Sequence, residues 1–487
     1  MSQKVKKRVQ ANSADRRRKA SRKRKKRNKR LQMLKRILLL SVLFIVVLTA
    51  AGVAAVFVLN QKPGREEPDT NIAQGIRQEE KDSGTKTVKE GNKENKGKKK
   101  TAGKKEGSAP DESNADDRAE RESQKTNKSA RGQAGEKIRK YIKKMTIEEK
   151  VAQLFMITPE ELTHVQNVVM AGDATRKALN QYPVGGLVYF KNNIQSEEQF
   201  SQMVKIAQSY SMDRTGLPLF IGIDEEGGTV RRISGRGFAN VPVIPDMGQV
   251  GEKKDSAAAY DIGLQIGEYL SRFQVNVDFA PVADVYSNPD NTVVGRRAFG
   301  SDPKLVADMV ANEVRGLKEK EIFSVLKHFP GHGNTAEDSH SGRACSYKSL
   351  EELRSCELVP FQAGIDAGAE FVMAGHISLP NVLGNDTPAS LSYQMITEVL
   401  RGEMGFDGIV VTDSLSMGAV SQNYTPEEAA VRAVLAGVDL VLTSGNFERA
   451  YTGVLDALKH GRITEEWVDA ALGRILKLKM AMVDAQS

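Results

Sequence analysis

The sequence predicts an α/β fold in which helices cover a parallel β-sheet. From about residue 136 onward, short apolar runs alternate with longer stretches whose apolar residues recur at helical spacing, and most of the apolar runs end in charged or polar residues. Alternating strands and helices are typical of βα units, whose strands lie parallel. Packing alone does not explain charge at the end of one apolar run after another. The pattern therefore points to a functional site at one edge of the sheet.

Eight apolar runs are predicted as strands, at 152–157, 186–190, 219–223, 275–279, 323–326, 371–374, 409–412 and 440–443. Helical patterns lie between them, for example at 196–209, 257–272, 303–318 and 426–436. Eight parallel strands over roughly 350 residues fit a single (β/α)8 TIM-type barrel. An open, doubly wound sheet is the alternative, but no Gly-rich phosphate-binding fingerprint follows the first strand.

Polar residues stand where TIM-type barrels carry their active sites, at the C-terminal ends of the predicted strands. They are Asp224 and Glu225 after the third strand, Asp278 and Asp284 around and after the fourth, Lys327 and His328 after the fifth, His376 after the sixth and Asp413 after the seventh.

Two segments with contrasting charge open the chain. Residues 1–36 carry 18 Lys and Arg against one acid, Asp15, for a net charge of +17, so the chain's total of +9 leaves −8 for the remainder. Residues 37–59 are uncharged and would span about 34 Å as a helix, against a hydrocarbon core of about 30 Å. The sequence thus predicts a single-pass transmembrane helix at 37–59. The positive-inside rule places 1–36 in the cytoplasm as a basic tail and the catalytic domain outside the cell.

Two other functions could be assigned to this region. The basic tract could bind nucleic acid, but the adjoining apolar span favours a membrane-adjacent tail, so no nucleic-acid partner is expected. Small residues at 50–55 could mark a signal-peptide cleavage site, although the apolar region is too long and the leader too extended for that interpretation to be preferred.

Residues 60–135 are predicted to be a disordered, charged linker. Between residues 61 and 135 there is no Leu, Phe, Tyr or Trp, so this segment cannot bury enough apolar surface to offset its conformational entropy. The catalytic barrel is then expected at 136–487. Two cysteines, Cys345 and Cys356, are too few for a disulfide framework, and the sequence does not decide whether they pair.

The segment 327–340, with the sequence KHFPGHGNTAEDSH, concentrates three histidines, a lysine and carboxylates on a loop. Such a set suits hydrolysis by two mechanisms. In one, a carboxylate attacks an anomeric carbon while another group protonates the leaving oxygen. In the other, histidines and an aspartate hold a metal that activates water. His328 and His332 are four residues apart, but the Pro and Gly residues between and beside them argue against a shared helical face and a helical zinc site.

Asp338 and His340 stand two residues apart and can point the same way on an extended segment. A carboxylate beside an imidazole orients it and stabilises its protonated form, which suits a proton donor near neutral pH.

Four segments together resemble the NagZ-type β-N-acetylhexosaminidases of glycoside hydrolase family 3, over about residues 145–480. They are GIDEEGG at 222–228, NVDFAPVADV at 276–285, KHFPGHGNTAEDSH at 327–340 and TDSLSM at 412–417. The resemblance implies that Asp413 is the nucleophile and that His340, paired with Asp338, is the general acid and base. It further implies that five residues hold the N-acetylglucosamine unit, namely Asp224, Arg232, Arg297, Lys327 and His328. His376 and Met417 are weaker candidates for lining the site, and no metal or other cofactor is expected.

By this resemblance the chain is expected to be a membrane-anchored, retaining exo-β-N-acetylglucosaminidase that acts on cell-wall muropeptides or similar chains in peptidoglycan turnover. A metal-dependent hydrolase on the same barrel is one alternative. A cell-wall sugar-binding module without turnover is another, against which Asp413 and His340 argue. The chain departs from the family pattern at Asn334, where many relatives carry an acid. Other members carry a second α/β domain, whereas one terminal helix is expected here after the eighth strand. The oligomeric state is not predicted.

Overall fold

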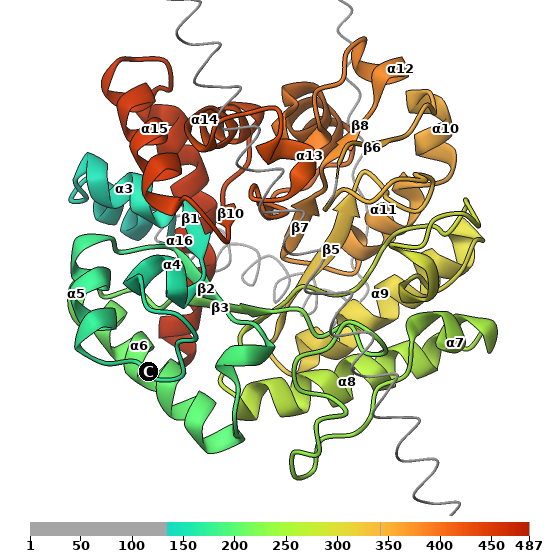
Figure 1. The fold of residues 1–487 in the computed structure, drawn as a ribbon, viewed down its shortest axis with the longest axis horizontal. Helices are drawn as coiled ribbons and strands as arrows, with labels where there is room; N and C mark the ends of the chain where they lie inside the picture. Colours follow the sequence, from blue (N-terminus) through green and yellow to red (C-terminus); the bar gives the residue numbers. More distant parts are fainter. Residues whose placement is uncertain (1–133, 341, 487) are drawn as a thin grey trace, which may run out of the picture. The chain divides into compact units, whose positions relative to one another are not determined.

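A computed structural model of the protein describes residues 134–340 and 342–486. Eight parallel strands in this part of the chain form a ring with helices around it (Figure 1). The strand order is β10-β1-β2-β3-β4-β5-β7-β9, and a parallel bridge between Val411 and Leu440 joins the last strand to the start of β10. The predicted TIM-type barrel is therefore confirmed.

The barrel strands are β1 (Phe155–Ile157), β2 (Gly186–Val188), β3 (Phe220–Ile223), β4 (Val277–Asp278), β5 (Phe323–Phe329), β7 (Phe371–Ala374), β9 (Ile409–Thr412) and β10 (Val441–Thr443). All eight predicted strands are present. The bounds of 371–374 and 409–412 are as predicted, and those of the other six strands differ by one to three residues at one or both ends. Residues 152 and 153 belong to a helix, because Thr146 and Glu149 form a capping box that starts this helix at Ile147. The fifth strand continues to Phe329, so Lys327 and His328 lie within it and not after it.

The helices around the barrel are α3 (Ile147–Gln153), α4 (Pro159–Thr163), α5 (Asp173–Gln181), α6 (Glu197–Thr215), α7 (Met247–Glu252), α8 (Ser256–Arg272), α9 (Pro303–Glu319), α10 (Leu350–Ser355), α11 (Leu358–Asp366), α12 (Pro380–Leu383), α13 (Gly418–Ser421), α14 (Pro426–Ala436), α15 (Phe447–Lys459) and α16 (Glu465–Gln486). Shorter helical turns are η1 (Lys191–Asn193), η2 (Gly295–Arg297) and η3 (Ala389–Leu391), and η4 (Gln394–Glu403) is a π-helix.

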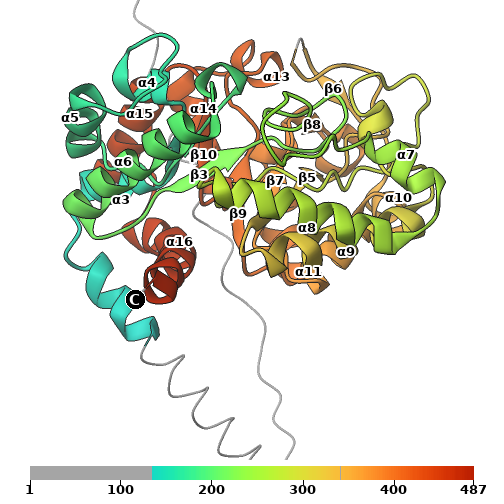
Figure 2. The ribbon, with the colours of Figure 1, turned by 90° about the horizontal axis from the view of Figure 1, so that it is seen from below.

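Helices α8 and α9 lie side by side against the barrel (Figure 2), and small residues permit their close approach. A Cβ atom on Gly263 would lie 2.5 Å from the Glu313 carbonyl oxygen, and one on Gly316 would lie 2.3 Å from the Tyr260 carbonyl oxygen. Asp302 caps α9, and Pro303 occupies its first turn, where a missing N–H costs no hydrogen bond.

Aromatic side chains and the last helix fill the N-terminal end of the barrel. The Phe220 and Phe371 rings meet edge to face with centroids 5.2 Å apart. Lys479 of α16 is buried beside them, with Nζ 5.2 Å from the Phe220 ring centroid and 2.9 Å from Gln153 Oε1. Because Phe220 is the first residue of β3, this packing lies at the end of the barrel opposite the C-terminal strand ends, where the predicted site residues stand.

Several expectations about the segments outside the barrel need correction or stay untested. Two helices, α15 and α16, follow the last strand, where one was expected. Residues 134 and 135, assigned to the linker, already belong to a helical segment at 134–142. The basic tail, the transmembrane span at 37–59 and linker residues 60–133 lie outside the described residues. Within 134–340 and 342–486, no helix combines the length and apolar character needed to cross a membrane. Cys345 and Cys356 are both free thiols.

Candidate active site

A buried cluster of opposite charges lies at the C-terminal ends of β3 and β5. Lys327 Nζ is 3.0 Å from Asp224 Oδ1 and 2.5 Å from Glu226 Oε1. Arg297 grips the same Glu226 carboxylate with two hydrogen bonds of 2.8 Å, from Nε and Nη2. The predicted residues Asp224, Lys327 and Arg297 are thus brought together. Glu226, which was given no role, is the carboxylate that joins them.

These charges stabilise one another against the cost of burial. Burial alone would raise the pKa of Glu226, but Arg297 and Lys327 lower it well below its usual range. Burial would lower the pKa of Lys327, but Glu226 and Asp224 raise it. The pKa of Asp224 is lowered by Lys327 and Arg232 against the effect of burial. The cluster therefore stays charged near neutral pH. We call these four residues, Asp224, Glu226, Arg297 and Lys327, the charged floor of the site.

Arg232 reaches the floor from the loop after β3, with Nη2 2.9 Å from Asp224 Oδ2. Glu225 holds this loop in place because its carboxylate accepts backbone N–H bonds from residues 232, 233 and 234 and a 3.0 Å bond from the Tyr269 hydroxyl. Gly227 and Gly228 adopt positive φ values of 87° and 52° and form the turn that directs the loop back. Glu225 therefore holds the loop in place, whereas the neighbouring Asp224 is part of the floor.

His328 completes the floor through Asp284. His328 Nδ1 lies 2.8 Å from Asp284 Oδ2, and His328 Nε2 lies 3.4 Å from Arg297 Nη2. A guanidinium can only donate, so Nε2 accepts and Nδ1 carries the proton that is donated to Asp284. Asp284 is buried, and His328 lowers the pKa of its carboxyl against the effect of burial.

Asp338 and His340 form the predicted pair on the loop after β5. His340 Nδ1 and the His340 backbone nitrogen both lie 2.9 Å from Asp338 Oδ1. The pKa of Asp338 is lowered because the hydrogen bonds from His340 outweigh the opposing effect of burial. With Nδ1 engaged by Asp338, Nε2 is the nitrogen that remains for proton transfer. The His340 side chain is 66% exposed and the Asp338 side chain is 46% exposed, so both can be reached by a substrate.

Asp413 follows β9, and its position is fixed by backbone contacts. Its N–H donates to the Ala374 carbonyl over 2.9 Å, and its Oδ1 accepts the Ser414 N–H over 2.7 Å. His376, a weaker candidate for lining the site, is buried, and its ring bonds to Ser390 Oγ and to the Ser414 carbonyl. Burial lowers the pKa of His376, so this histidine is neutral and supports the Asp413 loop. Met417, the other weaker candidate, is buried.

Backbone hydrogen bonds join the His340 loop to the Asp413 loop. The Gly418 N–H donates to the His340 carbonyl and the Ala419 N–H to the Ser339 carbonyl, both over 3.1 Å. An unpredicted two-stranded pair, β6 (Ala344–Cys345) and β8 (Ile377–Ser378), joins the segment that follows β5 to the segment that follows β7. A carboxylate and a histidine–carboxylate pair are thereby held on adjoining loops, beside the charged floor.

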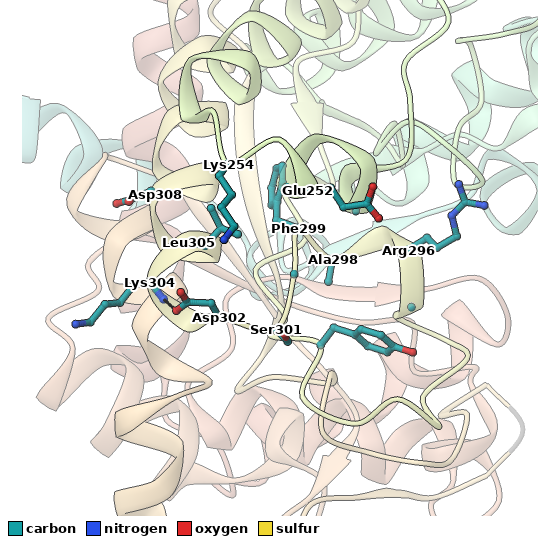
Figure 3. A pocket seen from close by; sticks show the side chains of 15 residues that line it. Glu252, Lys254, Arg296, Ala298, Phe299, Ser301, Asp302, Lys304, Leu305 and Asp308 are labelled. Carbon is teal, nitrogen blue, oxygen red and sulfur yellow. Dashed lines mark hydrogen bonds between the residues drawn. The ribbon is translucent and has the colours of Figure 1, made fainter.

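Three further observations concern the limits of the site. A surface pocket of about 670 Å³ between α7, η2 and the start of α9 is lined by Arg296, Phe299 and Asp302 among others, and it contains no predicted site residue (Figure 3). Across residues 134–340 and 342–486, no three His, Cys, Asp or Glu side chains are grouped so that they could hold a metal ion. Asn334, the departure from the family pattern, accepts a 3.1 Å hydrogen bond from Ser346 Oγ.

Comparisons with known proteins match this arrangement to one family. The model of the glycosyl hydrolase family 3 N-terminal domain matches residues 146–478. β-Hexosaminidase A of Pseudoalteromonas piscicida is 33% identical over 322 residues, which are 62% of this chain and 54% of that protein, so the chain spans about half the length of this relative. β-Hexosaminidase LpqI of Mycobacterium tuberculosis is 31% identical over 343 residues, covering 68% of this chain and 82% of that protein. A solved glycoside hydrolase family 3 β-N-acetylglucosaminidase from Paenibacillus sp. strain FPU-7 has a TM-score of 0.65 at 38% identity and covers 69% of this chain and 62% of that one.

Proposed function

Because the chain belongs to glycosyl hydrolase family 3, we propose that it is a retaining exo-β-N-acetylglucosaminidase, with cell-wall muropeptides as its substrate class. One observation carries the proposal. Asp413 and the Asp338–His340 pair lie on two loops that are hydrogen-bonded to each other, at the mouth of a barrel whose floor holds Asp224, Lys327 and Arg297. The β-hexosaminidases and the β-N-acetylglucosaminidase that the chain resembles support the choice of sugar.

The chemistry proceeds in two displacements. The Asp413 carboxylate attacks the anomeric carbon, the bond from that carbon to the aglycone oxygen breaks, and His340 delivers its Nε2 proton to the departing oxygen. His340 then takes a proton from water as the water oxygen attacks the same carbon and releases Asp413. Two inversions leave the β configuration unchanged. Asp338 fixes the ring orientation and favours the charged imidazolium before the first step.

The floor binds the terminal sugar. Asp224 accepts hydrogen bonds from sugar hydroxyls, and Lys327, Arg232 and Arg297 donate to sugar oxygens or to the acetamido group. His328, whose only ring N–H is donated to Asp284, lines the floor and helps to position Arg297. Because Lys327 and Arg297 are already held by carboxylates, these donors are preorganised, and binding does not have to immobilise them.

The anchor at 37–59 and the linker place the catalytic domain outside the cell membrane in this proposal. The helical segment where the linker joins the barrel contacts its N-terminal side. Lys137 Nζ lies 3.0 Å from Asp484 at the end of α16, and the Tyr141 hydroxyl bonds to the Thr215 carbonyl at the end of α6. The active-site loops occupy the opposite ends of the strands. This arrangement leaves the mouth open to cell-wall glycan, consistent with a role in peptidoglycan turnover.

The purified protein should release nitrophenol from 4-nitrophenyl N-acetyl-β-glucosaminide and act far more slowly on the matching β-glucoside. Activity should survive exhaustive chelation, and Asp413→Asn should fold normally yet lose several orders of magnitude in turnover, because an amide cannot attack the anomeric carbon. A folded Asp413→Asn variant with the wild-type rate would remove Asp413 from the mechanism. Activity lost to chelator and restored by zinc would favour the metal-dependent alternative, and sugar binding without turnover the binding module.

A further inference from the structure

We propose that Ser339 and His332 form a latch that positions the acid–base residue His340 beside Asp413. The proposal rests on the glycosidase function proposed above and assigns positioning roles to two residues outside the predicted site. Ser339 lies between Asp338 and His340 in the chain, and it differs from both in burial. Its neighbours' side chains are 46% and 66% exposed, whereas Ser339 is 2% exposed.

The buried Ser339 side chain ends on a histidine. Ser339 Oγ lies 3.0 Å from His332 Nε2, and His332 is itself 2% exposed. Burial lowers the pKa of His332, so the ring is neutral near pH 7. His332 therefore does not act as a proton donor in the reaction, and its ring serves as a fixed hydrogen-bond partner for Ser339.

Hydrogen bonds to Asp284 and Thr335 hold His332 in place. The His332 backbone N–H donates to Asp284 Oδ1 over 2.7 Å, which is the carboxylate that also orients His328. Thr335 Oγ1 lies 2.8 Å from His332 Nδ1 and donates to the His332 carbonyl over 3.0 Å. With that hydroxyl proton engaged, Nδ1 donates to Thr335, and Nε2 is left to accept the Ser339 hydroxyl proton. The latch thus connects the exposed pair to the buried wall of the sugar site.

The main chain of the same residue is tied to the nucleophile loop. The Ser339 carbonyl accepts from the Ala419 N–H and the His340 carbonyl from the Gly418 N–H, and both donors lie on the segment that follows Asp413. Ser339 is therefore held at two points. Its side chain bonds to His332, and its carbonyl bonds to the segment that follows Asp413. Loss of the side-chain contact leaves the exposed His340 positioned by main-chain contacts and its bond to Asp338, and a displacement of about 1 Å in a reacting group can cost about 100-fold in rate.

The test compares two substrates on each preparation of the full-length protein: an activated 4-nitrophenyl N-acetyl-β-glucosaminide, and a disaccharide with a poor leaving group. Ser339→Ala should lower kcat about 10- to 100-fold for the disaccharide. The nitrophenyl substrate should show a burst of phenol followed by a slow steady rate, because base catalysis of the second step also weakens. Ser339→Thr, which keeps the hydroxyl, should restore most of the rate. Ser346→Ala removes another buried serine hydroxyl, one that bonds to Asn334, and should leave the ratio of the two rates unchanged.

The ratio of the two rates on one preparation does not depend on the fraction of protein that is folded, so partial unfolding cannot imitate the result. An equal loss on both substrates without a burst, or wild-type rates on both substrates in Ser339→Ala, would overturn the latch while leaving the glycosidase proposal standing. A wild-type protein inactive on both substrates would overturn the glycosidase proposal, and the latch with it.

Discussion

Replacing Glu226 with glutamine tests how strongly the charged floor supports the fold. The carboxylate compensates two cations at once, with Oε1 2.5 Å from Lys327 Nζ and both oxygens 2.8 Å from Arg297 nitrogens. All three side chains are largely buried, with Lys327 and Glu226 2% exposed and Arg297 15% exposed. Glutamine keeps the shape but removes the negative charge, and its NH2 group must face a guanidinium or an ammonium donor in either orientation.

The expected loss follows from leaving buried cations without their shared carboxylate. Breaking a buried ion pair by removing one partner costs about 3–5 kcal/mol of unfolding free energy. Denaturant unfolding followed by the fluorescence of Trp467, the single tryptophan, measures it. The pKa of Lys327 should also fall. Of the two carboxylates that raise this pKa against the effect of burial, Glu226 has the larger influence. The KM for the aryl glycoside should rise as the donors on the floor lose their fixed positions.

Glu148→Gln is the matched control, since Glu148 pairs with Lys459 over 3.0 Å at the surface, where the two side chains are 52% and 44% exposed. An exposed pair of this kind is worth about 1 kcal/mol or less. If Glu226→Gln lost no more stability than this control, the reasoning that the floor is a closed, mutually compensated set of charges would be refuted.

Two further predictions concern a buried acid and the membrane anchor. Glu313 of α9 is buried, neither of its oxygens has a hydrogen-bond partner within the described residues, and burial raises its pKa from 4.5 to about 8. Between these two pH values the folded state holds a proton on Glu313 that the unfolded state releases. The stabilising effect of this proton is fully present below about pH 4.5 and is lost as the pH rises to about 8. The free energy of unfolding should fall by on the order of 1 kcal/mol per pH unit in this range. Glu313→Gln should flatten this dependence in unfolding measured across pH, and an unchanged slope would contradict the assignment. Protease added to intact cells should cut the 60–135 linker and release active enzyme, whereas activity that is protected until lysis would reverse the proposed orientation.

The sequence predicted the barrel because its signals are local. Residues 371–374 and 409–411 are uniformly apolar, and strands β7 and β9 are buried and have the predicted bounds. Helix α14 also matches its predicted range, since Thr425 caps it, Pro426 occupies its first turn and Gly437 ends it. The first strand was predicted too long because apolar residues at its start serve equally well as the last turn of α3.

The partners within the site were harder to predict, because they are distant in the chain. Glu226 is one of three consecutive acids, and only the fold brings Arg297 and Lys327 to it across 71 and 101 positions. The signal was present in the DEEGG sequence, where a third acid close to a buried strand end requires a cation. Ser339 gave no signal of its own, since the burial of a serine between two exposed residues depends on where His332 lies. The pairing of Asp338 with His340 was predictable because spacing alone determines it.

The central claim is that Asp413 forms a glycosyl-enzyme whose hydrolysis depends on His340, and one experiment tests both parts. His340→Ala is mixed with 4-nitrophenyl N-acetyl-β-glucosaminide, quenched in acid within the first turnovers, digested and examined by peptide mass spectrometry. The leaving group needs little protonation, so the first step should proceed, and the second should stall without a base. One N-acetylglucosaminyl unit should be found on the peptide that contains Asp413, together with a burst of phenol, and added azide should speed the slow phase and remove the adduct. An adduct on another residue, or uniformly slow turnover with neither burst nor adduct, would contradict the mechanism.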